Sequence, residues 1–113
     1  MNNAFERIRD ELLTWDGITT RPGRFGAVAF HVGPREVGHL HGSDHADLPF
    51  PRKVRAELVE SGRAIPHYFL PDTGWVTFPM RGDKGVDGAL ALFRLNYELI
   101  TKKKQYTEST EEG

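Results

Sequence analysis

Bulky and small side chains alternate with period two in residues 26–32 and again in residues 35–41, on either side of Gly33-Pro34. Side chains of a strand point alternately to the two faces of a sheet, and Gly-Pro interrupts regular structure. The pattern therefore predicts a β-hairpin whose turn is centred on Gly33 and Pro34. Three of the five histidines lie in this segment.

The turn also predicts which residues pair across the hairpin and which face each one occupies. The predicted pairs are Val32–Arg35, His31–Glu36, Phe30–Val37 and Val28–His39. One face would carry Val28, Phe30, Val37, His39 and His41, and the other Ala27, Ala29, His31, Glu36, Gly38 and Leu40. A slip of one residue would exchange the two faces, so the assignment depends on the turn.

Apolar residues at three- and four-residue spacing predict helices over residues 3–15 and 83–100. Asn3 with Glu6 three positions later is an Asn variant of the capping box, which marks a helix start. A further helix is predicted over residues 51–62, because Pro suits the first helical turn and Gly suits the position after the end.

The remaining apolar segments predict short strands. They cover residues 46–50, 64–70 and 74–80, and residues 18–25 form a short extended piece with a Pro-Gly turn. The predicted order is α-β-β-β-α-β-β-α, with strands mainly in hairpins. We therefore expect an α+β fold, a two-layer sandwich with an antiparallel sheet of about five strands and helices on one face. The other face of the sheet would stay partly open.

The length of 113 residues suits one domain, which we place at residues 1–101. Residues 102–113 are polar and lack apolar periodicity, so we expect a disordered C-terminal tail. The chain has no cysteine, which excludes disulfides and thiolate chemistry. No apolar run is long enough for a membrane span and the first residues are polar, so we expect a soluble, cytoplasmic protein, monomeric or weakly dimeric.

The net charge of −1 shows no overall attraction to nucleic acid. Four cations gather in or just after the predicted helix 51–62, namely Arg52, Lys53, Arg55 and Arg63. Weak nucleic-acid binding through this helix is a second alternative, but a solvated helix face is the favoured interpretation. Arg21 and Arg24 flank the Pro22-Gly23 turn, where solvated charges are again favoured over an anion site.

Four blocks lie in order within about residues 24–100, namely REVGHLHG, DLPFPRKVRAELVESGRA, PHYFLPDTGWVTFPM and ALALFRLNYELI. Together they resemble the Luciferase domain family of small proteins. The resemblance implies an α+β fold and no particular activity, and the name is not a sign of light emission. More distantly, GWVTF and NYELI resemble the YjbR-like proteins, which share a fold with frataxin-like proteins. Asn96 stands where serine is typical of that group.

The best candidate for chemistry is the pair His39 and His41, which lie two residues apart on one strand and share a face. Imidazoles at this spacing can bind one metal ion, and His45 or Asp47 could add a ligand. Nitrogen and oxygen ligands suit zinc, nickel or iron. The alternative is that these histidines are packed structural residues. For an enzyme, His39, His41 and Asp47 could supply a base and its orienting carboxylate. Ser43 or Thr77 could act as nucleophile, but no nucleophile motif surrounds either.

The interpretation that the sequence favours is a non-enzymatic module that binds a small molecule or a protein partner on the open sheet face. A metal-binding or metal-dependent enzymatic site is the first alternative. The candidate ligand-binding residues are His39, His41, Asp47, His67 and Trp75, and the candidate metal ligands are His39, His41, His45 and Asp47. Trp75 alternates with the apolar set Val76, Phe78 and Met80, so it can reach the open face, with burial under the helix as an equal alternative.

Overall fold

A computed structural model describes the backbone of residues 3–67 and 73–112, and their side chains except at 82–83 and 103–112. The helices are α1 (Ala4–Leu12), α2 (Arg52–Glu60) and α3 (Gly82–Glu112), and a short 3-10 turn, η1, covers Arg24–Gly26. The strands are β1 (Ile18–Pro22), β2 (Val28–Val32), β3 (Arg35–His41), β4 (His45–Pro49), β5 (Ile65–Pro66) and β6 (Trp75–Pro79).

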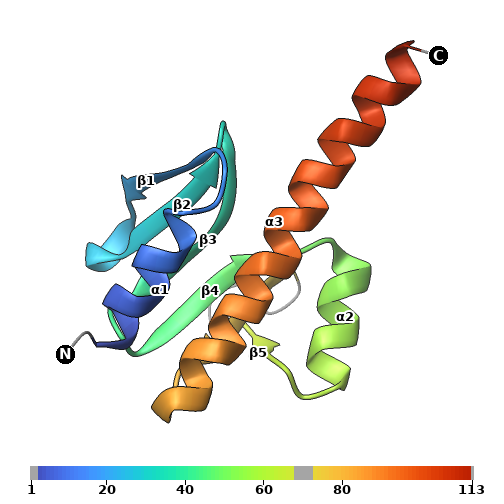
Figure 1. The fold of residues 1–113 in the computed structure, drawn as a ribbon. Helices are drawn as coiled ribbons and strands as arrows, with labels where there is room; N and C mark the ends of the chain where they lie inside the picture. The colour runs from blue at the N-terminus through green and yellow to red at the C-terminus, as the bar shows by residue number, and fades with distance from the viewer. Residues whose placement is uncertain (1–2, 68–72, 113) are drawn as a thin grey trace.

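Within these residues, six strands form one antiparallel sheet in the order β1-β2-β3-β4-β6-β5, and the helices pack against it (Figure 1). The predicted α+β class and antiparallel sheet are confirmed. The sheet has one strand more than the five expected, because residues 18–22 of the extended piece after α1 pair with β2 as strand β1. Residues 68–72, with part of the predicted second hairpin and its turn, lie outside the described residues.

The hairpin of β2 and β3 turns at Gly33-Pro34 as predicted, and the pairs Val32–Arg35 and His31–Glu36 are confirmed. The next pair is Phe30 with Gly38, so the predicted Phe30–Val37 and Val28–His39 pairs are wrong. Val37 is the extra residue of a β-bulge, and every residue beyond it changes face. His39 and His41 therefore do not share a face with Val28, Phe30 and Val37. They lie with Ala29, His31 and Glu36 instead.

The bulge is held from α3 by Asn96, a residue that is 2% exposed. Its Nδ2 donates hydrogen bonds of 2.8 Å to the carbonyl oxygens of Val37 and Pro49. The extra residue of a bulge lacks a regular ladder partner, so this amide satisfies a backbone group that would otherwise be buried alone. Gly38 is required beside it, because a Cβ there would lie 2.8 Å from Phe93 and 2.9 Å from Leu48.

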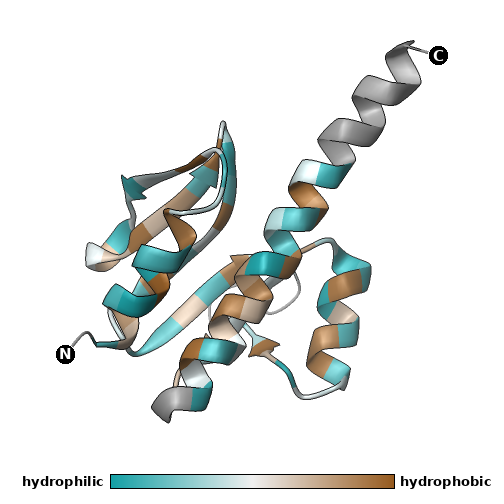
Figure 2. Ribbon diagram, viewed as in Figure 1, coloured by the Kyte–Doolittle hydropathy of each residue, from teal (hydrophilic) through white to brown (hydrophobic). Residues whose placement is uncertain are grey.

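The helices cover one face of the sheet. α1 packs on α3, which crosses β3 and β4, and α2 packs on β5 and β6 (Figure 1). Apolar positions recur along each helix between polar ones (Figure 2), and those of α3 meet Phe30, Leu40, Leu48 and Val76 in the core. The predicted Asn3–Glu6 capping box is present at the start of α1. No helix in the described ranges is long and apolar enough to cross a membrane.

The backbone of α3 continues to Glu112, through the segment for which the sequence predicts disorder. Lys, Gln and Glu favour helix, so a helix already formed over its apolar turns extends through polar residues. The apolar contacts of α3 with the core are made before residue 101, by residues such as Phe93 and Tyr97. The division into a domain at 1–101 and a separate tail at 102–113 stays a prediction.

Candidate metal centre on the open sheet face

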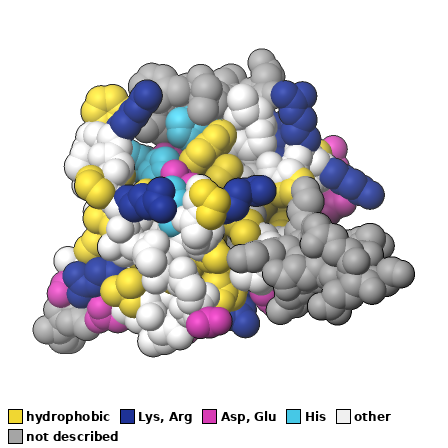
Figure 3. All heavy atoms as spheres, turned by 90° about the horizontal axis from the view of Figure 1, so that it is seen from above, with side chains coloured by type: hydrophobic (Ala, Val, Ile, Leu, Met, Phe, Trp, Pro, Cys, Tyr) yellow, Lys and Arg dark blue, Asp and Glu magenta, His cyan; other side chains and the backbone are white. Residues whose placement is uncertain are grey.

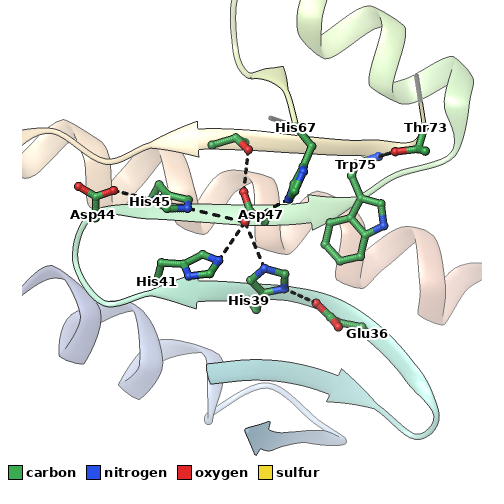
Figure 4. Close-up of polar contacts among 10 residues, drawn as sticks. Glu36, His39, His41, Asp44, His45, Asp47, His67, Thr73 and Trp75 are labelled. Carbon is green, nitrogen blue, oxygen red and sulfur yellow. Dashed lines mark hydrogen bonds and ion pairs between the residues drawn. The ribbon is translucent and has the colours of Figure 1, made fainter. Parts of the chain in front are cut away.

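The carboxylate of Asp47 is the centre of the open face. Asp47 is fully buried although it points away from the helices, because four histidine side chains surround it (Figure 4). Its Oδ2 atom lies 3.1 Å from Nε2 of His39 and 3.1 Å from Nε2 of His41. Nε2 of His67 is 3.4 Å away and Nε2 of His45 is 3.7 Å away. Each of the four imidazoles thus faces Oδ2 of Asp47 with its own Nε2 atom.

Three strands bring these side chains together. His39 and His41 are two residues apart on β3, which places both on one face as predicted, and the bulge makes that face the open one. Asp47 lies on β4 opposite His39 on one side and opposite Thr77 of β6 on the other. His45 is two residues before Asp47, and His67 follows β5 directly. Antiparallel pairing therefore converts period-two spacing within each strand into one cluster across the sheet.

Further polar groups orient the cluster. The carboxylate of Glu36 accepts a hydrogen bond of 2.7 Å from Nδ1 of His39, and Asp44 accepts one of 2.7 Å from Nδ1 of His45. The hydroxyl of Thr77 donates to Oδ1 of Asp47 at 2.7 Å. Because Glu36 holds the Nδ1 proton of His39, the Nε2 atom is directed at Asp47. Carboxylates in this position orient the histidine ligands of many metal sites.

The pKa values follow from these contacts. Burial lowers the pKa of His39, but hydrogen bonds to Asp47 and Glu36 outweigh it and raise the pKa from 6.5 to about 9. For Asp47 burial acts to raise the pKa, whereas hydrogen bonds from His39 and Thr77 lower it to about 2. Burial and the charge of His45 lower the pKa of His41. Without a metal ion, His39 is therefore an imidazolium between two carboxylates at neutral pH.

His39, His41 and Asp47 form the group of ligands, among the residues described, that could hold one metal ion. Their ligand atoms all lie within 4.8 Å of one another. His45 and His67 contact Asp47 but do not belong to that group. Three of the four predicted metal ligands are thus brought together, and the fourth, His45, lies next to them. His67, a predicted ligand-binding residue and a further candidate for the third metal ligand, contacts Asp47 as well.

A cleft of about 940 Å³ opens over this cluster. His39, His41, Asp47, His67 and Trp75 all line it, so every predicted ligand-binding residue reaches the same space. The Trp75 ring lies 5.4 Å from the ring of His39 and 5.9 Å from that of His67, on the open face as its alternation with Val76 predicts. His31 also lines the cleft, and its buried Nδ1 makes no hydrogen bond to any residue that the structure describes.

Ser43 and the basic residues of α2, which the sequence also suggested, lie outside the cleft. Ser43 is in the turn between β3 and β4 and accepts a hydrogen bond of 3.0 Å from the backbone N–H of Phe5, a structural role. Of the basic residues at α2, Arg52, Lys53 and Arg63 are exposed and Arg55 is half-buried. None of the four lines the cleft, and nucleic-acid binding by this helix stays a prediction.

A sequence profile of the Luciferase domain family matches residues 34–96, which is more than half of the chain. The chain belongs to the Luciferase domain family. The matched segment runs from the turn before β3 into α3 and contains Glu36, Asp47, Thr77 and all the histidines except His31. No curated protein and no solved structure matches the chain. The likeness to YjbR-like and frataxin-like proteins stays a prediction.

Sequence reasoning did not assign Glu36, Asp44 or Thr77 to the site. The signal for Glu36 was available, since it stands three residues before His39, but the wrong register placed the two on opposite faces. Asp44 directly precedes His45. Thr77 was considered as a nucleophile, and the structure instead makes it a hydrogen-bond donor to Asp47. Its role depends on the pairing of β4 with β6, which local sequence does not show.

Proposed function

We propose that this domain binds a divalent transition-metal ion through Nε2 of His39, Nε2 of His41 and Oδ2 of Asp47. The observation that supports it is the separation of 3.1 Å between each Nε2 atom and Oδ2. Ligands on a tetrahedral ion with bonds of about 2.0–2.1 Å stand about 3.3 Å apart, so small movements of these side chains would admit the ion. In the metal-free protein, a proton on Nε2 of His39 links this atom to Oδ2 of Asp47 instead.

The ligand types narrow the choice of ion. Two imidazoles and one carboxylate suit zinc, iron, nickel or cobalt, whereas magnesium and calcium prefer oxygen ligands throughout. Glu36 supports the proposal further, because a carboxylate is a common hydrogen-bond acceptor for the second ring nitrogen of a metal-bound histidine.

Three protein ligands leave at least one coordination position for another molecule. Catalytic zinc sites keep such a position, whereas structural sites fill all four. The cleft lies directly beside these ligands, so a small molecule could reach that position. A bound ion would act there as a Lewis acid. The proposed function is therefore metal-dependent binding of a small molecule on the open sheet face.

A titration with Co²⁺, Zn²⁺ and Ni²⁺ tests the proposal, with visible absorption for Co²⁺ and imidazole NMR signals for Zn²⁺. We expect micromolar or tighter binding, with shifts centred on residues 37–48. His39→Ala/His41→Ala should weaken the affinity by about 100-fold or more, since ligand loss exceeds the roughly 10–100-fold loss for outer residues. His31→Ala is the matched control, a cleft histidine outside the ligand set. Equal affinity in the wild type and the double variant would refute the proposal.

A further inference from the structure

The cleft has a rim that differs chemically from its histidine floor. Part of the rim comes from the end of β1 and the segment that follows it, with Arg21, Pro22, Gly23, Arg24 and Phe25 lining the cleft. In the space-filling view the histidines lie within a hollow with cationic and apolar side chains around it (Figure 3). The family match begins at residue 34, so this part of the rim lies outside it.

The charges of the cleft favour an anion. Arg21 and Arg24 at the rim balance Glu36 and Asp47 at the floor. A divalent ion held by His39, His41 and Asp47 would make the net charge of these groups positive. The guanidinium of Arg21 is positioned by a hydrogen bond of 3.1 Å to the carbonyl oxygen of Gly33. Guanidinium groups bind carboxylates and phosphates in a planar, two-pronged geometry.

The apolar part of the rim is held in an unfavourable conformation. Phe25 has a left-handed backbone with φ of 56°, and its side chain is 82% exposed. A bulky residue rarely adopts this conformation, and an exposed phenyl ring contributes none of the hydrophobic stabilisation that its burial would give. Two hydrogen bonds close the loop around it, from Gly23 N–H to Ala27 O at 2.7 Å and from Ala27 N–H to Arg24 O at 3.1 Å. The loop thus presents Arg24 and Phe25 together at the cleft.

From these observations we infer that the cleft binds a small organic anion with a flat apolar body. Its carboxylate or phosphate group would lie toward the metal ligands and the arginines, and its body would contact Phe25 and Trp75, which both line the cleft. This inference rests on the proposed function, because it names the class of molecule that would take the open position on the ion.

The test uses benzoate and phenyl phosphate as probes, with benzyl alcohol as the uncharged control and inorganic phosphate as the control without an apolar body. Each is titrated into the Zn²⁺-loaded and the chelator-treated full chain. Trp15→Phe removes the only other tryptophan, which packs against Tyr97 on the helix side, so the fluorescence then reports Trp75. Whichever of the two anionic probes binds more tightly identifies the head group.

We expect at least one anionic aromatic probe to bind the loaded protein more tightly than either control. Arg24→Gln should weaken it about tenfold, as for loss of one charge-assisted hydrogen bond, whereas Arg52→Gln on the exposed face of α2 should not. Phe25→Gly should also weaken it without lowering the unfolding midpoint, because glycine adopts the left-handed backbone freely. The midpoint measurement separates a lost contact from a lost fold.

The outcomes distinguish the two proposals. If Zn²⁺ binds but neither anionic probe does, or if Arg24→Gln and Phe25→Gly leave binding unchanged, the inference is wrong and the metal proposal stands. If Zn²⁺ does not bind, the titration of chelator-treated protein shows whether the cleft binds an anion without a metal ion. Probe binding that depends on Arg24 and Phe25 would then support the anion site alone, and its absence would refute both.

Discussion

Asp47 and Leu48 are neighbours on β4 and neither is exposed, yet they are buried in different ways. Leu48 lies in the apolar core beneath the helices. Asp47, on the opposite face, is covered by imidazoles and by the hydroxyl of Thr77. Apolar burial is non-directional and proportional to area, whereas a buried carboxylate needs partners at defined positions. The helix-covered face thus mainly supplies stability, and the open face holds polar groups in fixed positions.

The largest expected effect is a loss of stability from a substitution in the core beneath the helices. Phe93 is fully buried and meets the ring of Phe30 edge-on, with centroids 5.8 Å apart. Phe93→Ala should lower the free energy of unfolding by about 3–5 kcal/mol in urea denaturation. Co²⁺ affinity of the folded variant should stay within about twofold, because Phe93 lies in the apolar core and the ligand side chains lie on the opposite face of the sheet.

Leu13→Ala is the control, since Leu13 is 49% exposed and surface changes stay within about 0.5 kcal/mol. Phe93→Leu replaces Phe93→Ala if the latter does not fold. A large loss of Co²⁺ affinity in either variant would show that the two faces are not separable in this way.

Asn96 is the residue through which the faces should be coupled, because it reaches from α3 to the bulge that directs His39 and His41. Asn96→Leu leaves two buried carbonyl groups without a donor and should lower the free energy of unfolding by about 2–3 kcal/mol. It should also weaken Co²⁺ binding, since the register of β3 is no longer specified. Leu92→Ala on the same helix is the control, expected to lose stability with its Co²⁺ affinity intact. Unchanged affinity in Asn96→Leu would contradict the coupling.

The pH dependence of the metal-free protein probes the open face. The pKa of His39 is about 9 when folded and near 6.5 when unfolded, so the folded state binds the extra proton between these values. The stabilisation from this proton is complete below pH 6.5 and is lost as the pH rises to 9, by up to about 3 kcal/mol. Chelator-treated protein should therefore unfold more easily at pH 9 than at pH 6.5. Glu36→Gln should reduce the difference, and a stability that rises over this range would disprove the assignment.

The smallest expected effect on stability comes from removing the hydrogen bond between Thr77 and Asp47. Thr77→Val removes the hydroxyl that donates to Oδ1, which should lower the free energy of unfolding by about 1 kcal/mol. The pKa of Asp47 should rise from about 2 toward its ordinary value, measured by NMR of the carboxyl carbon. Thr20→Val on the exposed edge strand β1 is the control. An unmoved pKa would mean that the histidines alone hold the carboxylate ionised.

Much of the candidate site could be predicted, because two signals are local. The spacing of His39 and His41 places them on one face of any regular strand, and Trp75 alternates with Val76 on β6. The face that the histidines occupy was predicted wrongly. The turn at Gly33-Pro34 predicts the register only as far as His31–Glu36. The bulge at Val37 shifts the pairing of the later residues of β3 with β2 by one position.

By itself, the sequence determined the helices, the hairpin turn, the capping box and the alternation of apolar and polar positions along each strand. These depend on residues a few positions apart, through the periods of helix and strand. The tertiary structure alone decided the bulge, the pairing of β4 with β6 and the meeting of four histidines at Asp47. Each depends on contacts between distant residues, such as Asn96 with Val37, 59 positions apart. Such contacts have no local period, and only the folded chain brings them together.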